Sequence, residues 1–170
     1  MINLKENSIR RKADKLKKQL SKKELVVKPA QKIAILNNPQ SNLTFANLKF
    51  LQKTFGLSSS QFSIFTFKEK NDHYNELRGI VASKDVFSSF GKLKSPEIIE
   101  FLDKKYDLLL DFTGLTNVYE EYFSLSIQAN CRIGYYNEEE LYDLMLQIPA
   151  GDIKNYATES RKYLKIIGLL

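Results

Sequence analysis

Short apolar segments that alternate with helical patterns are the feature that most constrains how this chain folds. Residues 32–36 (Lys-Ile-Ala-Ile-Leu) and 107–112 (Asp-Leu-Leu-Leu-Asp-Phe) are nearly continuous apolar runs. Such runs are typical of strands that are buried on both faces of a parallel sheet, because a half-exposed strand would alternate apolar and polar residues. Further extended segments are predicted at residues 62–67, 79–82, 131–134 and 142–148.

Helical patterns lie between these extended segments, at residues 43–55, 95–105, 116–129 and 151–167. Strands that alternate with helices favour a parallel sheet with helices on both faces. We therefore predict one α/β domain of Rossmann-like type, a three-layer sandwich with a mainly parallel sheet of five or six strands. The strand at 107–112 should be central, beside the strand at 32–36.

The charge of the chain is divided unevenly. The first 32 residues hold 11 Lys/Arg against 3 Asp/Glu, whereas the remaining 138 hold 15 against 17. The sequence thus predicts a basic amphipathic helical arm with its linker at residues 1–31. A near-neutral α/β domain follows at 32–170, and its core pattern begins at Ile33.

The arm has the pattern of a helix with a narrow apolar stripe, formed by Ile9, Ala13, Leu16 and Leu20. A stripe narrower than about 100° predicts that the helix packs on the domain only along this line, or projects from it. Basic residues surround the rest of the helix. They are Arg10, Arg11, Lys12, Lys15, Lys17 and Lys18.

These six side chains are the predicted nucleic-acid-binding residues, and we expect them to contact phosphates of structured RNA such as ribosomal RNA. Each neutralised phosphate releases counterions, so a few such contacts give a salt-dependent affinity without base readout. Three alternatives stay open: a solvated helix without a specific role, a protein partner, and an anionic membrane surface. A membrane surface would be contacted through Ile2, Leu4 and the apolar stripe, but the arm offers no Trp or Phe anchor.

Two motifs resemble known families. Residues 106–114 (Tyr-Asp-Leu-Leu-Leu-Asp-Phe-Thr-Gly), followed by 131–134 (Cys-Arg-Ile-Gly), resemble the N-terminal Rossmann-like half of lipopolysaccharide heptosyltransferases. With the basic start and residues 142–146 (Tyr-Asp-Leu-Met-Leu), the whole chain resembles an uncharacterised family of short bacterial proteins. The first resemblance implies the fold, and the second covers most of the chain without implying an activity.

The chain departs from the heptosyltransferases in ways that argue against transferase activity. Residues 37–39 (Asn-Asn-Pro) replace the Gly-Asp segment that follows the first strand in that family, and the chain ends before a second nucleotide-binding domain. We therefore expect no enzymatic activity from this chain alone. The alternative is a degenerate transferase-like domain, or a binder of a nucleotide or sugar phosphate, at the carboxyl edge of the sheet, where open α/β sheets bind ligands. Its residues would be Asn37, Asn38, Asp111 and Thr113.

Other candidate chemistry is sparse. Four residues along a strand separate Asp107 from Asp111 by about 13 Å, too far for a catalytic carboxylate pair. His73 lies in the polar segment 71–76 without a second ligand type nearby, so we expect neither a metal nor a cofactor. Cys131 is the single cysteine and is expected in the core, which fits a reducing compartment. With no secretory signal or transmembrane pattern, we expect a cytoplasmic protein.

Overall fold

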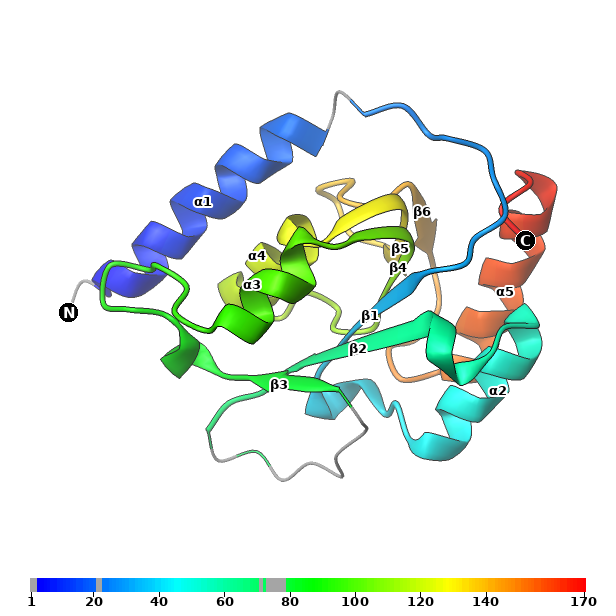
Figure 1. Ribbon diagram of the computed structural model, residues 1–170, viewed down its shortest axis with the longest axis horizontal. Helices are drawn as coiled ribbons and strands as arrows, with labels where there is room; N and C mark the ends of the chain where they lie inside the picture. Colours follow the sequence, from blue (N-terminus) through cyan, green and yellow to red (C-terminus); the bar gives the residue numbers. More distant parts are fainter. Residues whose placement is uncertain (1–2, 21–22, 71, 73–78) are drawn as a thin grey trace.

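The computed structural model describes residues 3–20, 23–70, 72 and 79–170, and within them six strands form one sheet in which every neighbouring pair is parallel (Figure 1). The strand order is β3-β2-β1-β4-β5-β6, so β1 and β4 are adjacent at the centre, as predicted. His73 and most of the polar segment around it lie outside the described residues. The strands are β1 (Ile33–Asn37), β2 (Phe62–Phe67), β3 (Ile80–Ala82), β4 (Lys105–Asp111), β5 (Gln128–Tyr135) and β6 (Leu144–Leu146).

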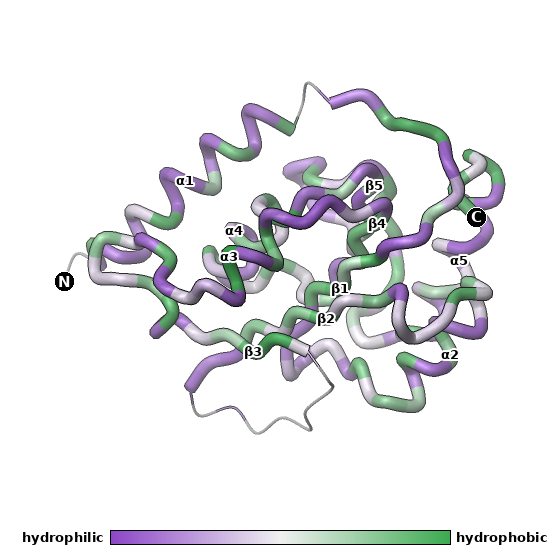
Figure 2. Tube along the Cα trace, viewed as in Figure 1, coloured by the Kyte–Doolittle hydropathy of each residue, from purple (hydrophilic) through white to green (hydrophobic). Residues whose placement is uncertain are grey.

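Helices cover both faces of this sheet, which confirms the predicted three-layer Rossmann-like arrangement. Successive side chains of β1 point to opposite faces, so Ile33 and Ile35 pack with α2 and α5, whereas Ala34 and Leu36 pack with α3 and α4. Figure 2 shows the apolar residues concentrated along the central strands. The helices are α1 (Leu4–Leu20), α2 (Phe45–Phe55), α3 (Pro96–Asp103), α4 (Val118–Ser126) and α5 (Ile153–Ile166).

The predicted boundaries around β5 and β6 were wrong. The helix predicted to reach residue 129 ends at Ser126, and β5 begins at Gln128 because this residue pairs with Lys105 at the start of β4. Strand β6 has three residues rather than the seven predicted, since Tyr142 turns into the core instead of joining the sheet. The pairing of Gln128 and the burial of Tyr142 set these two boundaries, and local sequence propensity predicts neither of these long-range contacts.

Helix α1 lies along α4 and is part of the core (Figure 1). Ile9 is 0% exposed within the cluster on the α3/α4 side, and Ala13 is buried among residues that include Leu125 and Tyr142. The helix therefore packs through its narrow apolar stripe, and the expectation that the core begins at Ile33 was wrong. The reason is that α4 leaves apolar surface on its outer side, which the stripe of α1 covers.

Candidate nucleic-acid interface

The six basic residues of α1 fall into two groups once the helix has docked. Arg10, Arg11, Lys15 and Lys18 are exposed. The ammonium group of Lys12 instead donates a hydrogen bond to the carbonyl oxygen of Gly91 at 2.5 Å. Four of the six residues predicted to contact phosphates are thus exposed to solvent. Lys12 is partly buried and holds the helix on the body.

Lys17 forms the second anchor. Its ammonium group lies 2.6 Å from a carboxylate oxygen of Glu121 on α4 and also pairs with Glu139 in the loop before β6. Partial burial alone would lower the pKa of Lys17, but the hydrogen bonds and negative charges of Glu121 and Glu139 raise it. Lys17 therefore stays charged and holds α1 on the body.

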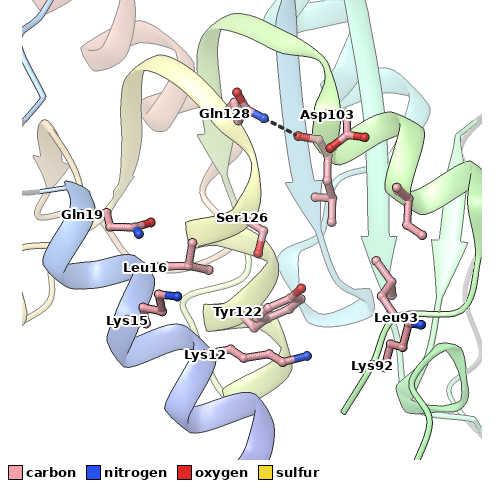
Figure 3. A pocket seen from close by; sticks show the side chains of 12 residues that line it. Lys12, Lys15, Leu16, Gln19, Lys92, Leu93, Asp103, Tyr122, Ser126 and Gln128 are labelled. Carbon is pink, nitrogen blue, oxygen red and sulfur yellow. Dashed lines mark hydrogen bonds between the residues drawn. The ribbon is translucent and has the colours of Figure 1, made fainter.

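A groove follows the line where α1 and the linker meet the body, and we name it the α1 seam. It consists of three adjoining hollows of about 550, 380 and 710 Å³, which share lining residues such as Gln19, Lys23 and Gln128. Figure 3 shows the first hollow, where Lys12 and Lys15 on α1 face Tyr122 and Lys92. Its size is within the range of ligand-binding clefts.

The α1 seam is basic. Lysines contribute seven of its lining residues and aspartates two: Lys12, Lys15, Lys23, Lys28, Lys32, Lys92 and Lys105 against Asp103 and Asp107. Some of this charge is used within the molecule, because Lys28 pairs with Asp107 at 2.7 Å and Lys23 donates to the carbonyl oxygen of Ala129. Lys15, Lys92 and Lys105 form no ion pair with any residue that the structure describes. The seam therefore holds cationic groups that a bound anion can neutralise.

Asp107 shapes the far end of the α1 seam by fixing the linker. Its carboxylate accepts hydrogen bonds from the backbone N–H groups of Gln31 and Lys32, each at 2.9 Å. Burial opposes ionisation, but the hydrogen bonds from Lys28, Gln31 and Lys32 outweigh it, so the pKa of Asp107 is lowered. Asp107 is thus a structural carboxylate at the amino edge of the sheet, and Asp111 lies at the opposite edge.

Polar side chains at the carboxyl edge form a buried hydrogen-bond network. Asp111 accepts hydrogen bonds from the backbone N–H of Thr113 at 2.9 Å, from the hydroxyl of Thr113 at 2.7 Å and from the hydroxyl of Tyr142 at 2.7 Å. Asn38 donates to the carbonyl oxygen of Thr113 at 3.1 Å and to Glu120 at 2.8 Å. Burial raises the pKa of Glu120, and the hydrogen bonds from Asn38 and Thr116 oppose that rise.

The structure brings together three of the four residues predicted for a ligand at this edge. Asn38, Asp111 and Thr113 are linked to one another, whereas Asn37 turns sideways, donating to Thr66 at 3.4 Å and accepting from Ser41. All four are buried. Most of their polar atoms therefore have protein partners, as in the turn-capping role that an Asx residue commonly takes.

The motif at 131–134 proves structural. The guanidinium of Arg132 donates to the carbonyl oxygens of Ser124 and Ile127, which lie at the carboxyl end of α4 and just after it. A side chain at Gly134 would overlap the ring of Tyr142, so glycine leaves the space in which Tyr142 reaches Asp111. Burial raises the pKa of Cys131 to about 12, consistent with the predicted core position.

Sequence reasoning did not identify Tyr142 or Glu120 as partners of the predicted site. Burial and the charge of Asp111 raise the pKa of Tyr142 well above its ordinary value, so its hydroxyl remains a donor. The only available signal was that Tyr142 lies in a motif that carries a family resemblance. Contacts between side chains that are far apart in the sequence cannot be predicted from the spacing of residues within one segment.

The part of the chain that the structure describes contains neither a cluster of metal ligands nor a helix able to cross a membrane. No cluster of three or more His, Cys, Asp or Glu side chains is arranged there to hold a metal ion. None of the described helices combines the length and the apolar character needed to cross a bilayer.

Comparison with known proteins adds a family but no activity. The sequence profile of a family of unknown function, DUF6913, matches residues 5–167. Neither the curated proteins nor the solved structures contain a match. The matched range includes most of α1 as well as the sheet. The resemblance to an uncharacterised family is thereby confirmed, whereas the bacterial origin and the likeness to heptosyltransferases stay predictions.

Proposed function

We propose a role for this chain from its membership of the DUF6913 family of unknown function, to which it belongs. The role is that of a non-catalytic Rossmann-like module that docks through α1 on RNA, such as ribosomal RNA. The observation that carries the proposal is that α1 packs on the body through its apolar stripe and keeps most of its basic side chains exposed. The exposed ones are Arg10, Arg11, Lys15 and Lys18.

The lysines of the α1 seam extend this basic surface from α1 toward the amino edge of the sheet. A surface that combines a helix with a lysine-lined groove matches the spaced phosphates of a nucleic acid backbone better than it matches a single small anion. The body would then serve as a rigid support or as the platform for a protein partner.

The docked position of α1 favours RNA over a membrane. Insertion into a bilayer would need the apolar stripe, but Ile9 is buried against the body and Leu16 and Leu20 pack around Ala13. Leu4 is exposed, and Ile2 lies outside the described residues. A membrane-bound form would therefore have to undock α1 and expose apolar surface on α4.

The test is RNA binding measured by fluorescence anisotropy over a range of salt concentrations. The wild type should show a log–log salt slope of several units, and replacing Arg10, Arg11, Lys15 and Lys18 with Gln should reduce that slope by about one per residue. The matched control neutralises four exposed residues of α5, on the other face of the sheet: Lys154, Arg161, Lys162 and Lys165.

The control variant should bind RNA like the wild type, apart from a small effect of net charge. Equal losses in the two variants would show that binding follows net charge alone and would overturn the proposal. Tight binding to anionic vesicles without binding to RNA would replace it with the membrane alternative.

The carboxyl edge of the sheet is the second candidate, as a site for a nucleotide or sugar phosphate. One observation favours it: Oδ1 of Asn38 is buried and has no hydrogen-bond partner among the described residues. A thermal-shift screen against nucleotides, nucleotide sugars and sugar phosphates tests this site. Stabilisation that disappears in Asn38→Ala, while the variant stays folded, would establish it in place of the non-catalytic docking role.

A further inference from the structure

A short hairpin beside α1 carries a strongly exposed aromatic side chain. Phe87 and Leu93 pair as an antiparallel bridge, and between them the backbone N–H of Ser88 donates to the carbonyl oxygen of Lys92 at 2.8 Å. Gly91 has a φ of +72°, a left-handed conformation that favours glycine in such a tight turn. Phe90 at the tip is 81% exposed, although Phe87 at the base is buried.

The hairpin is held on α1 by two hydrogen bonds. The hydroxyl of Ser8 donates to the carbonyl oxygen of Phe90 at 2.8 Å, and Lys12 donates to that of Gly91 at 2.5 Å. A side chain at Gly91 would lie 2.8 Å from the hydroxyl of Ser8, so the glycine also permits this close approach. The backbone that carries Phe90 is therefore fixed relative to the basic helix.

Cationic side chains lie near this aromatic tip. Lys12 donates to the carbonyl oxygen of Gly91, next to Phe90, and Lys12 and Lys15 line the same hollow as Lys92. The hairpin itself contributes Lys92 and Lys94, both exposed. An exposed ring next to a lysine-lined groove is an arrangement by which proteins hold unpaired nucleotides, the base stacked on the ring and the phosphates on the cations.

We propose that Phe90 is a stacking platform for a base in a single-stranded segment of RNA, with Lys15 and Lys92 contacting the adjacent phosphates. This inference rests on the proposed function and specifies its ligand. Bases in a duplex are stacked and paired, so a protruding phenyl ring offers them no face to bind, whereas an unpaired base presents one.

Phe45 provides the matched control. It is 64% exposed on α2, across the sheet, and the ammonium group of Lys49 lies 4.6 Å from the centre of its ring. The two phenylalanines are thus both exposed, but only Phe90 lies beside α1. Substituting either removes little buried surface and should leave the fold intact.

The experiment compares the wild type, Phe90→Ala, Phe90→Trp and Phe45→Ala on a 12-nucleotide oligouridine containing one 2-aminopurine and on a duplex of the same length. Phe90→Ala should weaken binding to the single strand by roughly 5- to 150-fold and abolish the change in 2-aminopurine fluorescence that stacking produces. Phe90→Trp should retain both properties. Phe45→Ala should match the wild type, and duplex affinity should be unchanged in all variants.

Three results would overturn the inference. If Phe90→Ala and Phe45→Ala bind the single strand alike, the ring at the hairpin tip has no role in binding. The same holds if the wild type binds RNA and shows no 2-aminopurine response, and in both cases the proposed docking on RNA survives. If the wild type binds neither the single strand nor the duplex at low salt, the proposed function fails together with the inference.

Discussion

Replacing Ile9 with alanine tests whether α1 belongs to the cooperative core. The substitution removes three carbon atoms from a fully buried side chain, and at about 0.8 kcal/mol for each buried methylene the transfer term is about 2.4 kcal/mol. The cavity adds to this cost, but a helix at the surface can settle toward α4 and fill part of it. We therefore expect the free energy of unfolding to fall by about 2–4 kcal/mol.

Urea denaturation followed by far-ultraviolet circular dichroism and by tyrosine fluorescence measures this change. With a denaturant slope of about 2 kcal/mol/M, the midpoint should fall by about 1–2 M, and both signals should move together. Leu4→Ala is the control in the same helix, because Leu4 is 65% exposed, and its effect should stay within about 0.5 kcal/mol. Equal shifts in the two variants, or an unfolding step of α1 that precedes an unchanged main transition, would refute the reasoning.

Three further substitutions test the contacts at the two edges of the sheet. Asp107→Asn should lower the free energy of unfolding by about 1–3 kcal/mol, because it weakens the hydrogen bonds that hold the linker. Since the folded-state pKa of Asp107 is lowered, the stabilisation by its carboxylate is present above about pH 4 and is lost as pH falls through the folded-state pKa. Acid-denaturation curves of the variant should lack this pH-dependent loss. Gly134→Ala should cost about 1–3 kcal/mol or more by forcing the ring of Tyr142 aside, as a lowered melting temperature would show. Tyr142→Phe should cost about 1.5–3 kcal/mol, measured by urea denaturation, because it deprives buried Asp111 of a donor; a change below 0.5 kcal/mol would contradict the network.

Local patterns were sufficient to predict most of the elements. The apolar runs at β1 and β4 predicted buried parallel strands at the centre of the sheet, because a strand that is covered on both faces must be apolar along its whole length. The stripe that begins at Ile9 likewise predicted the contact line of α1, since helical spacing places these residues on one side.

The sequence by itself therefore determined the alternation of strands and helices, the apolar line on α1 and the excess of positive charge around it. Tertiary structure alone decided the partners of these groups. It buried Ile9 in the core, used Lys12 and Lys17 as anchors, brought Lys15 and Lys92 to one hollow, and joined Asp111 to a tyrosine 31 residues away. The physical reason is that backbone periodicity is local, whereas burial and hydrogen bonding depend on which distant segments pack together.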